Sequence, residues 1–212
     1  MKFYYHPVSS FSQKALIGLH EKGVKFEPQI VNLMDAAARE AYRKVNILGK
    51  VPTLVLDDGW TIPESAIILE YIDTHFDSGT RLIPENKDEA RKARFYERLS
   101  DLYLHEPLTT VLFDSRKPEA EREPKRVAAA KARLDTMFES LDKHLAKRTW
   151  ALGDAFSIAD CSMAPALGYL KMIYPYAKHA NLMSYAGRLA ERPSYRKVSE
   201  EAAPYLAKMM GG

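Results

Sequence analysis

The stretch "KVPTLVLDDGWTIPESAIILEYI", residues 50–72, limits most strongly what this chain can fold into. Two short runs rich in β-branched and aromatic residues, "TLVL" and "WTIP", are separated by "DDG", and an Asp-Gly pair is a strong signal for a hairpin turn. After Glu64, Ile68, Ile72 and Phe76 recur at the spacing of one helical face. The stretch therefore predicts two antiparallel strands followed by a helix that begins at Ser65.

The residues before this stretch predict a strand, a helix and a second strand. Residues 2–6 form a short aromatic run, residues 9–22 have helical spacing that ends at Gly23, and residues 25–33 read as a strand. Pro28 in the second strand lacks a backbone donor, which places that strand at an edge of the sheet. Two strands joined by a crossover helix are expected to be parallel. With a weaker helix at "DAAAREAYRK", the order β-α-β-α-β-β-α is that of a thioredoxin-like domain.

The second half of the chain is expected to be entirely helical. The polar segment "DSGTRLIPENKDEA" reads as a linker, because Gly79 and Pro84 interrupt regular structure. In "FSIAD", Ser157 and Asp160 have the spacing of a capping box at a helix start. The predicted fold is an α/β thioredoxin-like N-terminal domain, residues 1–78, followed by an all-α C-terminal domain, residues 86–212. Its helices are expected at about 87–114, 125–147, 157–173 and 181–191, with a shorter one near the end.

Composition excludes several classes of function. The net charge is +3, with 8 basic against 10 acidic residues in positions 1–80 and 23 against 18 in the remainder. Carboxylates interrupt the basic surplus, so we expect no nucleic-acid partner. Cys161 is the only cysteine, which excludes an internal disulfide and fits a reducing compartment. There is no signal peptide and no apolar run long enough for a membrane span, so a cytoplasmic protein without a membrane partner is expected.

Three segments carry polar groups suited to a ligand. The Val51-Pro52 pair, if its bond is cis, exposes the Val51 backbone amide and carbonyl to a peptide-like ligand. Glu64 and Ser65 open a helix whose first N–H groups suit a carboxylate, although Ser65 as a simple helix cap is an equal alternative. Ser9 and Ser10 lie where the first strand meets the first helix; they too are consistent with simple caps. No neighbouring histidine or carboxylate supports a hydrolase triad.

In their order and spacing these features resemble the cytosolic glutathione S-transferase superfamily over essentially the whole chain, and look closest to its serine-type classes (zeta, theta or phi). The resemblance implies that Ser9, with Ser10 as the near rival, donates a hydrogen bond to the glutathione sulfur beside Phe11. It implies that Val51, before Pro52, pairs with the cysteinyl backbone. The remaining implied glutathione contacts are the γ-glutamyl group with Glu64 and Ser65, and the glycine carboxylate with Lys50.

Two departures from the family pattern matter. Many relatives have an arginine after the Glu-Ser pair, where this chain has Ala66. Zeta-type isomerases have a cysteine two positions after the first serine, where this chain has Phe11, which argues against that activity. Tyr4 and Tyr5 stay open as alternatives to the serines, since other classes use a tyrosine at the end of this strand.

The predicted electrophile pocket comes from the helical half, near Phe11 and the segment "LYLHEPLTTVLF", where Pro107 bends or interrupts the helix. The residues expected to line it are Tyr103, Leu108, Val111 and Tyr169, although core packing explains each of them equally well. His105 and Cys161 are interpreted as structural.

The resulting hypothesis is a glutathione transferase that uses glutathione as co-substrate, needs no metal, and joins the thiolate to a small hydrophobic electrophile, as in detoxification. The alternatives are a non-catalytic binding protein of the same fold, or a glutathione-dependent peroxidase or dehalogenase. The resemblance also implies a homodimer. Ile67 and Ile68 offer adjacent apolar helix faces, one of which is available to a partner copy unless both are buried in the monomer.

Overall fold

The computed structural model describes residues 1–210, and of residues 209 and 210 it describes only the backbone. By contacts, the described chain forms two compact units, which are residues 1–83 together with the C-terminal helix from Pro193, and residues 84–192. The elements of the first unit are β1 (Lys2–Tyr5), α1 (Ser10–Glu21), β2 (Glu27–Ile30), α2 (Ala36–Tyr42), β3 (Thr53–Val55), β4 (Thr61–Pro63), α3 (Ser65–His75) and α9 (Pro193–Met210). Those of the second are α4 (Lys87–Ser100), a π-helical turn (Asp101–His105), α5 (Glu106–Ser115), a 3₁₀ turn (Glu119–Glu121), α6 (Pro124–Leu145), α7 (Ile158–Ile173) and α8 (Ala180–Glu191).

The first unit is built on a four-stranded sheet in the order β2-β1-β3-β4. β1 and β2 are parallel, as a crossover through α1 requires, while β3 is antiparallel to both β1 and β4. Pro28 lies in β2 at the edge of the sheet, where its missing N–H costs no ladder bond. The α/β thioredoxin-like arrangement expected from the sequence is thus confirmed.

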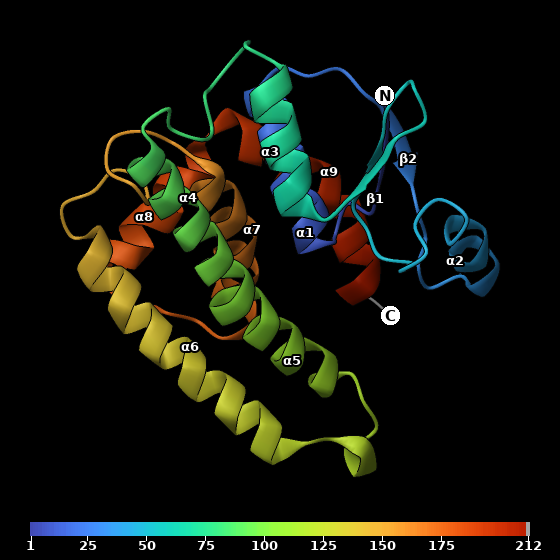
Figure 1. Ribbon diagram of the computed structural model, residues 1–212. Coiled ribbons are helices and arrows are strands. Elements are labelled where there is room, and N and C mark those ends of the chain that lie inside the picture. The colour runs from blue at the N-terminus through green and yellow to red at the C-terminus, as the bar shows by residue number, and fades with distance from the viewer. Residues whose placement is uncertain (211–212) are drawn as a thin grey trace. The chain divides into compact units, whose positions relative to one another are not determined.

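Helices α1 and α3 pack side by side next to the strands, while α2 lies on the other side of them (Figure 1). Gly18 allows this close contact, since a Cβ there would lie 2.1 Å from a methyl carbon of Leu69. At the C-terminal end of α1, Lys22 and Asp73 form a buried ion pair of 3.2 Å. Asp73 also accepts hydrogen bonds from the backbone of Leu82 and Ile83, so it ties the end of α3 to the start of the linker.

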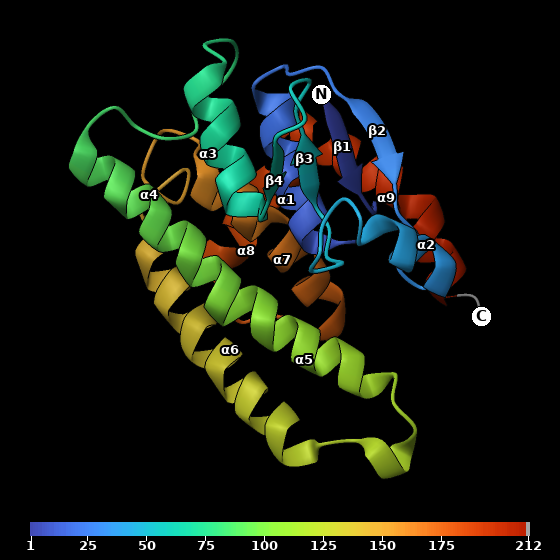
Figure 2. The same ribbon diagram turned by 45° about the vertical axis from the view of Figure 1, so that its right-hand side comes forward.

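The second unit is helical, with α4 packed on α7 and α5 packed on α6 (Figure 2). The capping box predicted in "FSIAD" is present: Ser157 accepts from the start of α7 and Asp160 accepts from the Ser157 backbone at 2.8 Å. Tyr185 of α8 donates to the buried Asp160 carboxylate at 2.6 Å. The interruption predicted at Pro107 takes the form of a π-helical turn that ends at His105, directly before α5. Pro107 is the second residue of α5.

One helix differs from expectation. The sequence predicts a last helix that is shorter than the others and belongs to the helical half, but α9 has 18 residues and packs on α1 in the first unit. Ser194, near its start, donates a hydrogen bond to Glu21 at the end of α1. The domain boundaries predicted from the sequence, residues 1–78 and 86–212, stay a prediction. Among the residues described, no helix is long and apolar enough to cross a bilayer.

Candidate functional site

The sheet brings three polar segments to one of its ends. In the antiparallel pairings, Tyr4 near the end of β1 lies opposite Thr53 at the start of β3, and Thr53 lies opposite Pro63 at the end of β4. Therefore the segment after β1, the segment before β3 and the segment after β4 all lie at the same end of the sheet. These are the segments that contain Ser9, Val51 and Ser65, which the sequence analysis selected as ligand-binding candidates.

Ser9 is the N-cap of α1. Its backbone is extended, its N–H donates to the carbonyl of His6 at 2.9 Å, and its hydroxyl oxygen accepts from Ser12 N–H at 3.3 Å. Within the described chain the Ser9 hydroxyl donates to no acceptor, so its proton is available for a ligand. Ser10 and Phe11, in the first turn of α1, are both half-buried. A hydroxyl donor at a helix N-terminus is a suitable environment for an anion.

Tyr5 is committed elsewhere. It is buried, and its hydroxyl donates a short hydrogen bond to the carboxylate of Glu201 in α9. Burial and the neighbouring Glu201 raise the pKa of Tyr5 above its usual value, which disfavours the phenolate. Tyr4 is half-buried and packs against the ring of Tyr42. These contacts favour Ser9 and Ser10 over the tyrosines as donors to a ligand sulfur.

The Val51-Pro52 peptide bond is cis. Lys50 is exposed and Val51 is half-buried. Within the described residues, neither the N–H nor the carbonyl of Val51 has a hydrogen-bond partner, because β3 begins only at Thr53. An accessible backbone donor and acceptor side by side can pair with a peptide-like ligand in the manner of a β-strand.

The N-terminus of α3 has no side-chain cap. Glu64 is the N-cap, with φ 70° and no side-chain cap bond, and it is the only non-glycine residue with positive φ in the described chain. Ser65, buried to 4% exposure, is the first helical residue, so the interpretation of Ser65 as a simple cap is wrong. The backbone N–H groups of Ser65, Ala66 and Ile67 have no acceptor among the described residues. A strained residue that holds open a helix N-terminus is typical of a binding site for a carboxylate.

The residues predicted for the electrophile pocket all lie in the second unit. Leu108 and Val111 of α5 are buried, whereas Tyr103 in the π-helical turn is 44% exposed and Tyr169 in α7 is half-buried. His105 is buried against the backbone carbonyl of Ser162 at 2.9 Å, and Cys161 is buried as well, which agrees with structural roles. These positions leave the electrophile pocket a prediction.

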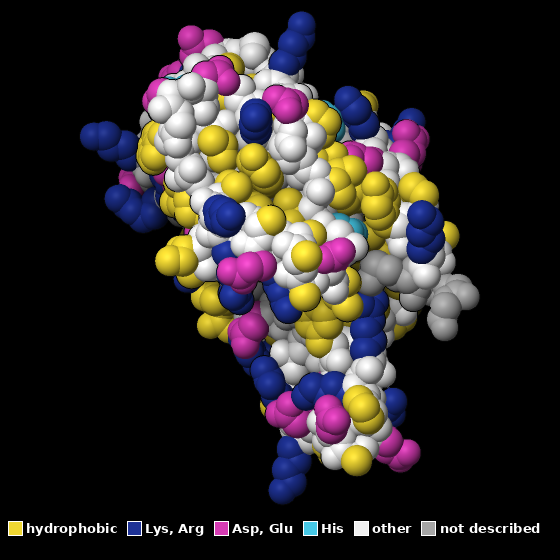
Figure 3. Space-filling model, turned by 90° about the vertical axis from the view of Figure 1, so that its right-hand side faces the viewer, with side chains coloured by type: hydrophobic (Ala, Val, Ile, Leu, Met, Phe, Trp, Pro, Cys, Tyr) yellow, Lys and Arg dark blue, Asp and Glu magenta, His cyan; other side chains and the backbone are white. Residues whose placement is uncertain are grey.

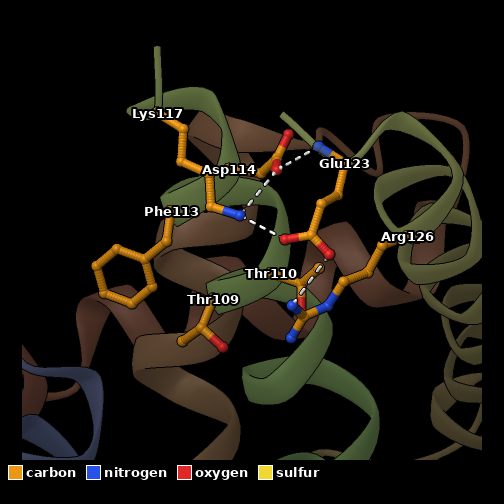
Figure 4. A pocket seen from close by; sticks show the side chains of 7 residues that line it. All are labelled: Thr109, Thr110, Phe113, Asp114, Lys117, Glu123 and Arg126. Atoms are coloured by element: carbon orange, nitrogen blue, oxygen red, sulfur yellow. Dashed lines mark hydrogen bonds and ion pairs between the residues drawn. The ribbon is translucent and has the colours of Figure 1, made fainter. Parts of the chain in front are cut away.

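One pocket of the second unit is lined by residues of α5, α6 and the loop between them. Figure 4 shows Lys117 reaching both Asp114 at 3.6 Å and Glu123, while Arg126 pairs with Glu123 from the other side at 3.5 Å. Phe113 points away from these ion pairs (Figure 4). None of the predicted electrophile residues lines this pocket. Its charges neutralise one another, so it presents no selective charge to a ligand.

A group of polar side chains beside Val51 was not evident from the sequence. Tyr42, Asn46 and Thr53 are buried; Tyr42 and Asn46 each hydrogen-bond to Thr53 Oγ1, and each also donates to the carbonyl of Lys50. No spacing rule identified them, because a tyrosine, an asparagine and a threonine in a helix, a turn and a strand are individually ordinary. Among the residues described, no group of histidine, cysteine or acidic side chains is arranged to hold a metal ion.

Family models match both parts of the chain. Residues 8–75 match the glutathione S-transferase N-terminal domain, and residues 124–207 match the glutathione S-transferase C-terminal domain. Glutathione S-transferase hmp2 of Hypomyces subiculosus is 32% identical over 199 residues, which cover 89% of this chain and 93% of the relative.

Solved structures agree with the sequence relatives. A glutathione S-transferase from Methylobacillus flagellatus with glutathione bound has a TM-score of 0.86 and 25% identity, and the match covers 93% of this chain and 98% of that one. A glutathione S-transferase from Methylobacterium radiotolerans in complex with glutathione sulfonate has a TM-score of 0.82 and 28% identity, with 93% of each chain covered. On these matches, the chain belongs to the glutathione S-transferase family.

Proposed function

We propose that the chain is a glutathione transferase that binds glutathione at the end of the sheet formed by β1, β3 and β4 and activates its thiol there. The carrying observation is that Ser9, Val51 and the start of α3 each have hydrogen-bonding groups without partners among the described residues, all at this one end of the sheet. A tripeptide with a thiol, two peptide bonds and two carboxylates matches a hydroxyl, a backbone strip and an open helix terminus. Two solved relatives are complexes with glutathione or glutathione sulfonate, which supports the same ligand here.

Each group has a proposed task. Ser65 and the free N–H groups of α3 bind the γ-glutamyl carboxylate, and Glu64, which is exposed, binds the γ-glutamyl ammonium. Val51 pairs its N–H and carbonyl with the cysteinyl backbone, and Lys50 meets the glycine carboxylate. Pro52 lies directly before β3, where its missing N–H costs no ladder bond. Ala66 supplies no charge where many relatives have an arginine, so the carboxylate depends more heavily on Ser65 and the helix N-terminus.

Ser9 is the proposed catalytic residue. A free thiol with a pKa near 8.5 is only a few per cent ionised at neutral pH. A hydrogen bond from Ser9 to the sulfur favours the thiolate by about 1.5–3 kcal/mol, which lowers the thiol pKa by roughly one to two units. The thiol proton leaves to solvent, and the thiolate forms the new S–C bond by attack on the electrophile. In a substitution the leaving group departs with the electron pair of its broken bond; in an addition the electrophile takes up the electron pair of its double bond and then a proton from solvent. Ser10 is the alternative donor.

The second substrate is proposed to be a small apolar electrophile bound by the helical unit. Tyr103 and Tyr169 are partly accessible to such a substrate, whereas Leu108 and Val111 are buried. Detoxification in the cytoplasm is the setting that fits such a reaction.

A homodimer is the proposed assembly. Ile68 of α3 is fully buried, whereas its neighbour Ile67 is 51% exposed, so one apolar face of α3 is left for a partner. Trp60, which precedes β4 and is 57% exposed, packs edge-on against Tyr71 of α3. Light scattering at micromolar concentration tests this proposal: a dimeric mass is expected, and a monomeric mass would refute it.

The function is tested by a conjugation assay at saturating glutathione with a panel of small electrophiles that includes a peroxide and a haloalkane. Turnover with conjugate formation supports the transferase. Turnover restricted to the peroxide or the haloalkane indicates the peroxidase or dehalogenase alternative. Glutathione binding without turnover on any of them would instead identify a non-catalytic binding protein.

A further inference from the structure

The loop between α2 and β3 carries a closed hydrogen-bond network that the sequence did not reveal. Figure 2 shows this loop lying beside α2 where it enters β3. Tyr42, the last residue of α2, places its hydroxyl 2.9 Å from the Lys50 carbonyl oxygen and 2.6 Å from Thr53 Oγ1. Asn46 places Nδ2 2.9 Å from the same carbonyl oxygen and 3.0 Å from Thr53 Oγ1. Tyr42, Asn46 and Thr53 are 4%, 6% and 0% exposed.

The protons of this network can be assigned without conflict. Asn46 Nδ2 donates one hydrogen to Lys50 and one to Thr53, and its Oδ1 accepts from Leu48 N–H at 3.1 Å. Tyr42 then donates to Lys50, and the Thr53 hydroxyl donates to Tyr42. The Lys50 carbonyl accepts two hydrogen bonds, which uses both of its lone pairs. Every polar group in the network is satisfied, and such a network rigidifies the backbone that it holds.

This network fixes the orientation of a single peptide group. The carbonyl of Lys50 and the N–H of Val51 belong to the same planar trans peptide, so they point in opposite directions. When Tyr42 and Asn46 hold the carbonyl on the buried side, the Val51 N–H must point away from that side. This N–H is one of the two backbone groups of Val51 that have no partner in the described chain.

We propose that Tyr42, Asn46 and Thr53 are positioning residues that lock the Lys50–Val51 peptide and present the Val51 N–H to the cysteinyl carbonyl of glutathione. The inference rests on the proposed glutathione function and extends it to side chains that do not touch the ligand. Their effect is on affinity, because the Val51 hydrogen bond is the same before and during the reaction of the sulfur. Loss of the lock leaves the peptide free to rotate, and binding then has to order it again.

The principal test is Tyr42→Phe, which removes one of the two hydrogen bonds to Lys50 and keeps the ring. We expect the KM and Kd for glutathione to rise about three- to tenfold, the equivalent of one hydrogen bond. The kcat and the pKa of the bound thiol are expected to stay near wild-type values, because Ser9 is untouched. Asn46→Asp keeps the bond from Leu48 and loses both donors, so it should weaken binding further. Tyr71→Phe, which removes a tyrosine hydroxyl outside the network, is the matched control.

A second readout observes the peptide directly. In protein labelled with ¹⁵N-valine, the Val51 amide signal should shift on addition of glutathione to the wild type, and should shift less in Tyr42→Phe. A variant that is only less stable loses active protein and therefore apparent kcat, but the remainder keeps its Kd.

The inference is overturned if folded Tyr42→Phe binds glutathione as the Tyr71→Phe control does, or if the Val51 amide does not respond in a wild type that binds glutathione. If Asn46→Asp does not fold, Tyr42→Phe and Thr53→Val decide the question. A wild type that binds no glutathione refutes the proposed function, and this inference with it. Wild-type binding with unchanged variants refutes the positioning role alone.

Discussion

Replacement of Ser9 by alanine should separate two contributions that one hydroxyl makes. As N-cap of α1, the oxygen accepts a hydrogen bond from Ser12 N–H at 3.3 Å. As donor, its proton has no acceptor in the described chain and is proposed to bind the glutathione sulfur. An oxygen can accept from the helix and donate to a ligand at the same time. Ser9→Ala removes both interactions, and each has its own readout.

The magnitudes follow from the chemistry of the two bonds. Loss of a serine N-cap costs about 1 kcal/mol of folding stability, and the long 3.3 Å bond places this case at or below that value. Loss of a charge-assisted hydrogen bond to the thiolate costs about 1.5–3 kcal/mol. The thiol pKa of bound glutathione should therefore rise by roughly one to two units, towards about 8.5, and kcat at pH 7 should fall by a factor of about 8 to 25, which is the ratio of the two thiolate fractions. Glutathione affinity should stay within a few-fold.

Ultraviolet absorbance of the bound thiolate, titrated against pH, measures the pKa directly. Thermal unfolding measures the loss of folding stability that follows from removing the N-cap hydrogen bond. Ser9→Thr should restore most of both effects, because threonine keeps the hydroxyl. Ser78→Ala is the matched control, since it removes a hydroxyl that donates to Lys22 O in the same unit and should leave the thiol pKa unchanged. A larger pKa change in Ser10→Ala than in Ser9→Ala would transfer the role to Ser10. No change in either variant would refute activation by a serine.

Three further predictions concern binding and stability. Ser65→Ala should raise the KM for glutathione more than it lowers kcat, because the carboxylate is held alike in ground and transition states; steady-state kinetics showing a loss of kcat alone would contradict this site. Asp160→Asn should lower the free energy of unfolding by about 1–3 kcal/mol, since the buried carboxylate accepts from Tyr185, Ser157 and Ala151; denaturant unfolding with an unchanged midpoint would contradict it. Burial lowers the pKa of His20 to about 4, so stability should decrease as pH falls from about 6.5 to about 4, where the unfolded chain binds a proton that the folded chain does not. His20→Phe also removes a buried ring nitrogen that has no partner among the described residues, and it should lessen this decrease by about 1–2 kcal/mol; an identical pH profile would rule out the assignment.

The local signals of the sequence predicted most of the first unit. Turn chemistry at "DDG", the edge proline in β2 and the helical spacing after Glu64 all depend on neighbouring residues, and the structure has the corresponding elements. The position of α9 could not be predicted in this way. Its contacts with α1 join residues far apart in the chain, as in the bonds from Tyr5 to Glu201 and from Ser194 to Glu21.

The candidate site was predictable in its parts but not in its geometry. Ser9, Val51 and Ser65 were selected from the types of residue at element ends. The positive φ of Glu64, the pairing of Tyr5 with Glu201 and the network around Lys50 depend on tertiary contacts that a single sequence does not specify.

Exposed apolar side chains are equally hard to predict from sequence. On the face that carries β2 and α2, Figure 3 shows hydrophobic side chains among charged ones, and Ile30 and Met34 in this region are 50% and 94% exposed.

The most direct test of the proposed thiol activation is calorimetric titration of the protein with glutathione at pH 7 in two buffers of different ionisation enthalpy. Binding at millimolar glutathione or below corresponds to about −4 kcal/mol or better. If the site lowers the thiol pKa by one to two units, binding should release a substantial fraction of one proton to the buffer. The observed heats should then differ between the two buffers in proportion to that fraction. Binding with equal heats in both buffers would contradict thiolate stabilisation, and no binding at millimolar glutathione would contradict the site itself.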